Sequence, residues 1–235
     1  MAALLVAVAG GDAFSQNGEF KLFRSGTDAL GAFITPDGNK YGYFVPQTRW
    51  ESERDGRTII FVCWENYNPD LNAEHLTIQK AVTESWQEHS KIEFRGWQPC
   101  AERSAGIRIY ISDEVAHTDG LGKMIDGKEH GMVLNFTFKN WSQDCNYSPE
   151  QRKDCIKVIA VHEFGHAIGF AHEHMRPDKP DDCRKPAGQP AVPTAVRLTP
   201  YDPHSVMNYC NDEYNNNGEL SALDVDALHK VYGVK

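Results

Sequence analysis

One stretch decides the fold and the chemistry of this 235-residue chain: His162-Glu163-Phe164-Gly165-His166-Ala167-Ile168-Gly169-Phe170-Ala171-His172. Two residues four apart on an α-helix are separated by about 400° of rotation and about 6 Å of rise. His162 and His166 therefore project from one helix face and can both reach a single metal ion. Glu163 points away from that pair, so it can reach a water on the metal rather than the metal itself.

The rest of the stretch supplies a third ligand. Gly169 tolerates a positive φ, so the helix can end there and the chain can turn to bring His172 beneath the same ion. Three imidazoles leave one position open, as a catalytic zinc site requires, whereas a structural zinc site closes all four. The motif has no thiolate and too few carboxylates for calcium. We therefore expect one catalytic Zn²⁺ on His162, His166 and His172, with Glu163 as the general base and acid that moves the water's proton.

Composition and charge exclude several classes of partner. Hydrophobic residues make up 40% of the chain and charged residues 24%, close to globular averages. The formal net charge is -9 and no run of Lys and Arg occurs, so we expect no nucleic acid partner. No stretch is long and apolar enough to span a membrane, and the apolar run at the N-terminus is too short.

The N-terminal region is expected to be processed or irregular. The apolar run of residues 1–9, with Ala13-Phe14-Ser15 as a small-x-small cleavage site, resembles a secretory signal over residues 1–15, although no Lys or Arg precedes it. The alternatives are a buried N-terminal strand and a truncated sequence. Residues 16–57 are rich in Gly and polar residues, which favours an N-terminal extension or a pro-segment.

Hydrophobic periodicity then predicts a regular domain. The order of strands and helices favours an α+β fold. The expected strands are 58–64, 92–94, 107–111 and 132–138. The expected helices are 75–89, with Ile78, Val82 and Trp86 as its apolar stripe, 155–170, and a last helix capped by Ser221 and ended by Gly233.

Six cysteines indicate disulfides and an oxidising compartment. No C-x-x-C occurs, so a zinc ribbon or a thioredoxin-like redox site is excluded. Six cysteines allow 15 pairings, of which we favour the sequential one, and buried free thiols are the alternative. The favoured pairs are Cys63 with Cys100, Cys145 with Cys155, and Cys183 with Cys210.

The motif HExxHxxGxxH followed by a methionine turn resembles the metzincin metallopeptidases. The methionine turn matches Ser205-Val206-Met207-Asn208-Tyr209, with Met207 35 residues after His172. In metzincins this Met side chain lies beneath the metal as an apolar floor. The resemblance therefore assigns structural support to Met207 and to Gly169.

Within the metzincins the chain is most similar to the astacin-like group. Glu173, Arg176 and Asp178 match residues that follow the third His in that group, and Tyr209 matches a Tyr that can bind zinc at rest and then stabilise the oxyanion. The C-terminal segment 220–233 is more similar to matrixins, as in a bacterial-type secreted branch between the two groups. His174 lacks ligand spacing, so we expect it to face solvent or to contact the ligands from outside.

The resemblance implies an α+β metzincin (zincin-like) fold. It would have a twisted, mostly parallel sheet, a long active-site helix, a cleft, and a smaller irregular C-terminal lobe ending in a helix. The catalytic domain would span 58–235, with an upper lobe of about 58–172 and a lower lobe of about 173–235. Substrate would add as a strand at the sheet edge, expected near Leu121 to Met124, with 132–138 next inward.

The function implied is that of a secreted, monomeric zinc endopeptidase acting on proteins or peptides, through water activated by the metal and Glu163. A zinc-binding but catalytically silent secreted protein is the alternative. A zinc deaminase would need P-C-x-x-C, and an α/β-hydrolase would need G-x-S-x-G. Neither motif occurs.

Overall fold

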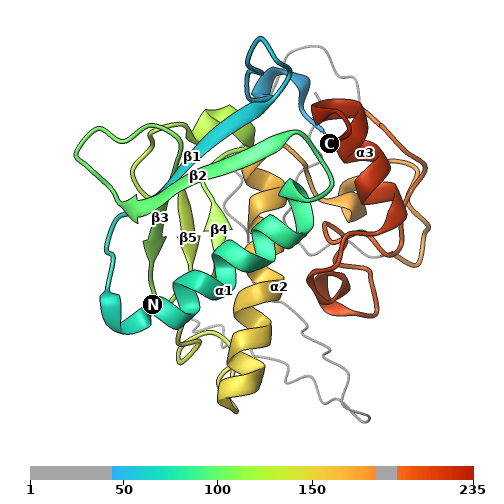
Figure 1. Cartoon of the computed structure of the whole chain (residues 1–235). Helices are drawn as coiled ribbons and strands as arrows, with labels where there is room; N and C mark the ends of the chain where they lie inside the picture. The colour runs from blue at the N-terminus through green and yellow to red at the C-terminus, as the bar shows by residue number, and fades with distance from the viewer. Residues whose placement is uncertain (1–43, 184–194) are drawn as a thin grey trace, which may run out of the picture.

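The computed structural model describes residues 44–183 and 195–235. The expected signal peptide, and the expected extension up to residue 43, lie outside the described residues. The described chain forms an α+β fold in which helices α1 and α2 pack against each other beside a five-stranded sheet (Figure 1). A C-terminal lobe with little regular structure ends in helix α3, drawn in red. The expected fold class is confirmed.

The sheet has the order β2-β1-β3-β5-β4 and is mostly parallel. Its strands are β1 Thr58–Trp64, β2 Ile92–Pro99, β3 Ile107–Ile111, β4 His117–Thr118 and β5 Met132–Leu134. β4 is the single antiparallel strand in the described sheet, and it pairs with β5. β1 lies between β2 and β3 and buries Thr58, Ile60, Val62 and Trp64 on one face, while Phe61 on the other face is 55% exposed.

The sheet edge differs from the expected one. We expected it near Leu121 to Met124, but Gly122–Ile125 forms a 3₁₀ turn, and the edge strand is His117–Thr118. β5 is next inward, as expected, although it ends at Leu134 instead of residue 138. The physical reason is Asn135, whose side-chain oxygen accepts the backbone N–H groups of Thr137 (2.8 Å) and Phe138 (2.7 Å). This side chain turns the backbone out of the ladder.

The first helix begins earlier and ends differently than the periodicity predicted. α1 spans Asn72–Val82, and residues Thr83–Gln87 continue it as a π-helical turn. The expected stripe of Ile78, Val82 and Trp86 is fully buried. This stripe confirms the predicted inner face of the helix.

The second helix, α2, spans Pro149–Ala167 and starts six residues before the expected position. Its N-cap is Ser148, whose side chain accepts the N–H of Gln151 at 3.2 Å. The C-terminal half is buried all round, so it runs through the core between sheet and C-terminal lobe. Trp86, in the turn that follows α1, donates a hydrogen bond from Nε1 to the Val161 carbonyl of α2 at 2.8 Å. This bond sets the position of α2 along its axis relative to α1.

Residues 44–50 belong to the same packed body as α2. Phe44 forms antiparallel bridges with Phe170 and Val196, and the indole of Trp50 donates to the Ala167 carbonyl at 2.8 Å. Both aromatic side chains are buried. This part of the expected extension therefore packs against the C-terminal end of α2. The domain boundary at residue 58 stays a prediction.

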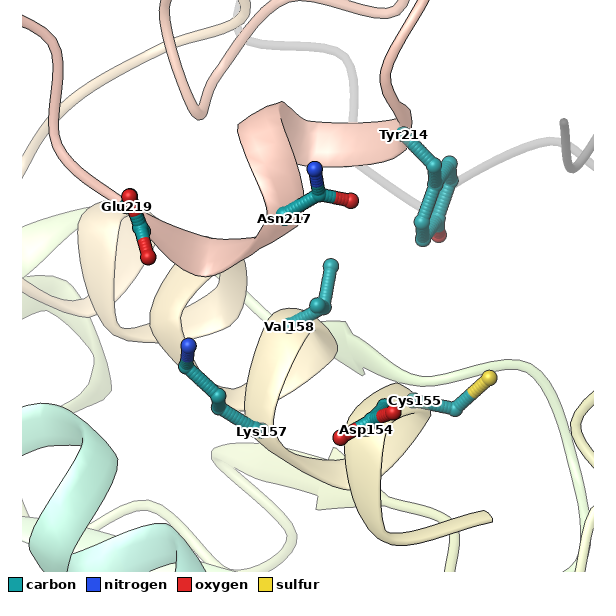
Figure 2. Close-up of a pocket in the computed structure, with 7 residues that line it drawn as sticks. All are labelled: Asp154, Cys155, Lys157, Val158, Tyr214, Asn217 and Glu219. Atoms are coloured by element: carbon teal, nitrogen blue, oxygen red, sulfur yellow. The ribbon is translucent and has the colours of Figure 1, made fainter. Parts of the chain in front are cut away.

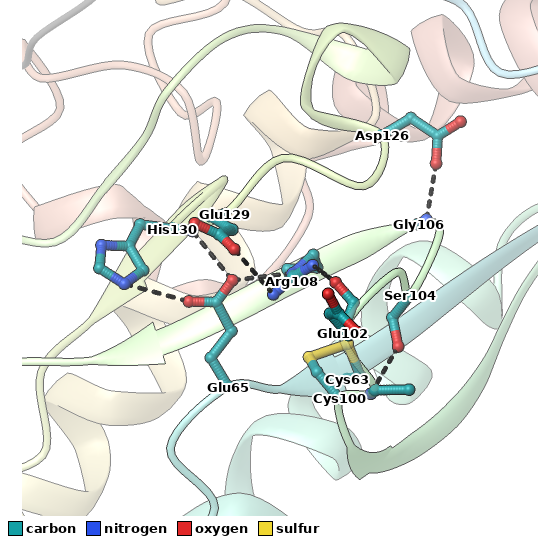
Figure 3. Close-up of a disulfide and its surroundings, with 11 residues drawn as sticks. Cys63, Glu65, Cys100, Glu102, Ser104, Gly106, Arg108, Asp126, Glu129 and His130 are labelled. Carbon is teal, nitrogen blue, oxygen red and sulfur yellow. Dashed lines mark hydrogen bonds and ion pairs between the residues drawn. A yellow bond between two sulfur atoms is a disulfide. The ribbon is translucent and has the colours of Figure 1, made fainter.

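Three disulfides confirm the sequential pairing of the cysteines. The bonds are Cys63–Cys100, Cys145–Cys155 and Cys183–Cys210. The first joins β1 to the residue after β2, and Figure 3 shows it beside a buried ion pair of Glu65 and Arg108 (2.9 Å). Glu65 also accepts the backbone N–H of His130 at 3.0 Å. These contacts hold the carboxyl end of β1 to the amino end of β3 and to His130, which precedes β5.

Across residues 44–183 and 195–235, no helix has both the length and the apolar character needed to cross a membrane.

Candidate metal centre

Three buried histidines converge on one point. His162 and His166 lie on α2, and His172 follows the helix after a turn at Gly169. The Nε2 atom of His172 lies 3.1 Å from that of His162 and 3.0 Å from that of His166. Each of the three residues is no more than 3% exposed. The structure thus brings together the three residues that the sequence analysis named as metal ligands.

The hydrogen bonds of the first two rings show which nitrogens face the centre. His162 donates from Nδ1 to the Val206 carbonyl (2.7 Å), and His166 donates from Nδ1 to the Phe170 carbonyl (2.8 Å). A carbonyl can only accept, so in each neutral ring Nδ1 carries the hydrogen and Nε2 carries the lone pair. Carbonyl partners of this kind orient metal-binding histidines.

The donor set fits a zinc ion. The Nε2 lone pairs of His162 and His166 both point at Nε2 of His172. An N–H on that nitrogen could donate to only one of the two. With Zn–N bonds of about 2.0–2.1 Å in a tetrahedron, ligand nitrogens lie about 3.3–3.4 Å apart. The observed separations of 3.0 and 3.1 Å are slightly shorter, so small outward movements of the rings would admit the ion. Within the described residues this trio is the one His, Cys, Asp or Glu cluster with ligand geometry.

Glycine makes the turn between the second and third histidine. Gly169 has φ +102° and its N–H donates to the His166 carbonyl at 2.8 Å, while Phe170 donates to the Gly165 carbonyl at 2.9 Å. A side chain at residue 169 would be strained at this φ, and its β-carbon would lie 2.7 Å from the Phe44 ring. The helix ends at Ala167, three residues before the expected end at residue 170, and Gly169 makes the expected turn just after it.

Glu163 is buried beside the histidines, with 3% of its surface exposed. It follows His162 on α2, so it leaves the helix about 100° round from that ligand. The carboxylate therefore lies close to the metal centre but outside the face that carries His162 and His166.

The methionine turn lies beneath α2 and is anchored by α3, which spans Ala222–Tyr232. Asp224 accepts the Ser205 hydroxyl (2.6 Å) and the Val206 N–H (3.0 Å). Ser221 and Asp224 also form the reciprocal capping box of the helix. Since the Val206 carbonyl holds His162, one carboxylate links α3 to a metal ligand through two residues of the turn.

The ring of Tyr209 stacks on two histidines and contacts a third, His172, at 4.5 Å. The Tyr209 ring lies 5.2 Å from that of His162 and 4.7 Å from that of His174, at interplanar angles of 18° and 19°. Its hydroxyl is 3.2 Å from His162 Nε2, at the metal centre. His174 is fully buried. Of the two alternatives expected for it, the solvent-facing one is therefore wrong, and the structure shows the other, contact with the converging histidines from outside.

The residues after His172 form a buried ion-pair cluster. Arg176 is 1% exposed and contacts Glu173 (3.1 Å) and Asp178 (2.7 Å). Burial raises the pKa of Glu173 to about 8, while hydrogen bonding from Arg176 lowers the pKa of Asp178 to about 2. Arg176 also donates to the carbonyls of Thr199 and Pro200 (3.0 Å each). The cluster ties the third-ligand segment to the chain that leads into the methionine turn.

The comparisons with known proteins agree with this geometry. The family model of the astacin peptidases matches residues 149–183, which include all three histidines, Glu163 and the ion-pair cluster. This segment of the chain resembles the astacin peptidases. Bone morphogenetic protein 1 of Xenopus laevis is 63% identical over 30 residues, and zinc metalloproteinase nas-39 of Caenorhabditis elegans is 34% identical over 77. The matches cover 12% and 27% of this chain but only 4% and 8% of those proteins.

Two solved structures share the fold. The chain superposes on myroilysin with a TM-score of 0.56 at 22% identity, covering 83% of this chain and 100% of that one. The hatching enzyme HCE-1 of Oryzias latipes, described as a zinc-protease, gives a TM-score of 0.53 at 19% identity, with coverage of 84% and 100%. At identities of 22% and 19%, these two likenesses support the fold alone.

A separate cavity of about 250 Å³ lies between α2 and the turn Tyr214–Gly218 (Figure 2). Val158 in its wall is one helical turn before His162 on α2. The other lining residues contain two carboxylates, an ammonium group and a phenol: Asp154, Cys155, Lys157, Tyr214, Asn217 and Glu219. None of the site residues expected from the sequence contributes to it, apart from Cys155 of a disulfide.

Proposed function

We propose that this protein is a zinc-dependent endopeptidase that hydrolyses peptide bonds in proteins or peptides. The observation that carries the proposal is the convergence of the Nε2 atoms of His162, His166 and His172 beside the buried Glu163. The match of the astacin peptidase model to the same residues supports it. So does the description of nas-39, which is named a zinc metalloproteinase.

Each protein group has a role in peptide hydrolysis. Zinc at the three nitrogens would polarise the scissile carbonyl and make water acidic enough to attack near neutral pH. Glu163 takes the proton of the attacking water and delivers it to the leaving amine nitrogen. The Tyr209 hydroxyl, 3.2 Å from His162 Nε2, donates a hydrogen bond to the oxyanion that forms from the carbonyl oxygen.

The sheet edge offers a way to bind extended peptides. β4, His117–Thr118, is the outer strand of the described sheet on the β5 side. A substrate strand would add to its free backbone groups, which recognise any extended peptide irrespective of side chains. Three disulfides further support secretion, because such bonds persist in oxidising compartments. We also propose that the protein acts as a monomer.

The test is digestion of casein and of a peptide library, together with measurement of bound zinc. Wild type, Glu163→Gln, chelator-treated protein and the exposed control Glu88→Gln are compared. We expect wild type and Glu88→Gln to cleave and bind about one zinc, in line with the single three-histidine site among the described residues. Glu163→Gln should bind zinc but lose at least about 10³ of turnover, since it loses both proton transfers.

If wild type binds zinc yet cleaves nothing, and Glu163→Gln behaves like it, the peptidase proposal is wrong. The protein would then be the zinc-binding, catalytically silent secreted protein.

A further inference from the structure

We propose that His174 is a positioning residue that holds Tyr209 in place at the metal centre. The inference rests on the proposed peptidase function, because it concerns the Tyr that would stabilise the oxyanion. It assigns a role to a histidine that is not a metal ligand.

The ring of His174 packs against two other rings, those of His172 and Tyr209. His174 lies 4.8 Å from the ring of His172 and 4.7 Å from that of Tyr209, at interplanar angles of 29° and 19°. His162 covers the phenol as well, at 5.2 Å and 18°. One of the two histidines that stack on Tyr209 is thus a ligand and the other is not. The ring of His172 also contacts the phenol, at 4.5 Å and 45°, so His174 is the one of these three histidines that is not among the three converging residues.

A hydrogen bond fixes the backbone of the same Tyr. The N–H of Tyr209 donates to Nδ1 of His174 at 3.3 Å. His174 is fully buried while Tyr209 is only half-buried, so the histidine is the more rigid partner. It therefore contacts both the ring and the main chain of Tyr209.

Two chain segments that are distant in sequence meet at this contact. His174 lies in the 3₁₀ turn Glu173–Met175, directly after the third ligand, whereas Tyr209 closes the methionine turn. The N–H of Glu173 donates to the Met207 carbonyl at 2.9 Å, so the two segments are already joined one residue earlier. His174 extends that junction to the phenol.

The expected kinetic effect depends on the step of the reaction at which the contact between His174 and Tyr209 acts. A hydrogen bond made only to the oxyanion stabilises the transition state and leaves substrate binding unchanged. Loss of His174 would leave the Tyr209 hydroxyl intact but less often in place. Turnover should then fall while KM stays constant, and the fall should need the hydroxyl of Tyr209.

The test is a double-mutant cycle with His174→Ala and Tyr209→Phe on the zinc-loaded protein. We expect His174→Ala to lower kcat about tenfold with KM within about twofold, since a full oxyanion donor is worth about 10²–10³. On the Tyr209→Phe background the same change should alter kcat by less than about twofold. Equal losses on both backgrounds would overturn the proposal, and so would a rise in KM with kcat unchanged.

Two conservative variants separate the contacts and guard against misfolding. His174→Phe keeps a stacking ring but has no acceptor, while His174→Asn keeps an acceptor near the Nδ1 position but has no ring. Each should recover part of the turnover lost in His174→Ala. If all three variants lose zinc and their turnover per bound zinc equals that of wild type, His174 retains the metal instead of positioning Tyr209. His75→Phe, at a buried histidine outside the site, is the control and should leave kcat within about twofold.

Amide hydrogen exchange provides a readout that needs no activity. In His174→Phe the Tyr209 amide should exchange at least about tenfold faster than in wild type, and in His174→Asn at nearly the wild-type rate. An unchanged rate in His174→Phe would refute the contact. This outcome is separate from failure of the peptidase proposal, which would show as a wild-type protein that binds zinc without cleaving.

Discussion

The sulfur of Met207 lies against the backbone of α2 at Gly165. A β-carbon added to Gly165 would clash with that sulfur and would stand 3.0 Å from a ring carbon of Trp86. Met207 is 2% exposed. The methionine turn can thus approach the helix this closely only because the residue before His166 has no side chain.

Gly165→Ala is therefore expected to destabilise the protein despite its better helix propensity. Alanine gains up to about 1 kcal/mol over glycine inside a helix, whereas overpacking a filled core costs about 1–3 kcal/mol. Trp86 cannot move away without breaking its hydrogen bond to Val161. Urea unfolding should show a net loss of stability, and adding Met207→Ala should cost less than the sum of the two single changes. A Gly165→Ala variant more stable than wild type would contradict this packing.

The local sequence signals predicted the elements that depend on spacing. The three histidines, the turn at Gly169 and the last helix between Ser221 and Gly233 follow from chain geometry and capping alone. The early start of α2 had a readable signal too, since Ser148 followed by Pro149 is a common way to begin a helix.

Other elements depend on contacts that no local pattern contains. β4 is two residues long, His117–Thr118, and exists only through its pairing with β5. The burial of His174 depends on Tyr209, 35 residues further along the chain. In both cases a distant segment determines the environment, so composition and periodicity carry no information about it.

The carboxylate of Asp224 should contribute more to the free energy of unfolding than an ordinary surface carboxylate on a helix. Asp224→Ala removes acceptors for the Ser205 hydroxyl and for the N–H groups of Val206 and Ser221. Hydrogen bonds to charged groups contribute about 1.5–3 kcal/mol, so we expect a loss of at least about 2 kcal/mol in unfolding free energy. Zinc affinity should fall as well, because the Val206 carbonyl orients His162.

The matched control is Asp226→Ala on the same helix. Asp226 is half-exposed and pairs with Lys230 at 2.8 Å, so its removal should cost less than about 0.5 kcal/mol. Equal effects of the two changes on unfolding and on zinc titration would show that the hydrogen bonds of Asp224 stabilise neither the fold nor the zinc site.

His75 should make stability depend on pH. Its ring is 4% exposed and packs on Trp64 (4.4 Å) and Tyr67 (4.9 Å), and neither ring nitrogen has a hydrogen-bond partner among the described residues. Burial lowers its pKa, although the charge of Glu74 partly opposes this. The native state therefore binds fewer protons than the unfolded chain once pH falls below about 6.5. This contribution to stability is fully present above that pH and is lost as pH decreases towards the folded-state pKa.

The measurement is urea unfolding between pH 5 and 8 for wild type and His75→Phe. The difference in unfolding free energy between the two proteins should shift in favour of the Phe variant as pH falls below about 6.5. A difference that stays constant over the whole range would mean that His75 does not titrate differently in the native and unfolded states.

The disulfide Cys183–Cys210 should affect turnover as well as stability. It closes a separation of 27 residues, for which chain entropy predicts about 3–4 kcal/mol. Cys210 directly follows Tyr209, so its release also loosens the chain that carries the phenol. We expect Cys183→Ser with Cys210→Ser to lower both the unfolding midpoint and kcat.

The comparison is Cys145→Ser with Cys155→Ser, whose bond spans 10 residues at the start of α2. That pair should lower the midpoint while leaving kcat within about twofold, because the first turns of α2 lie about 10 Å along the helix from His162. Equal losses of turnover in both double variants would show that the bond after Tyr209 serves stability alone.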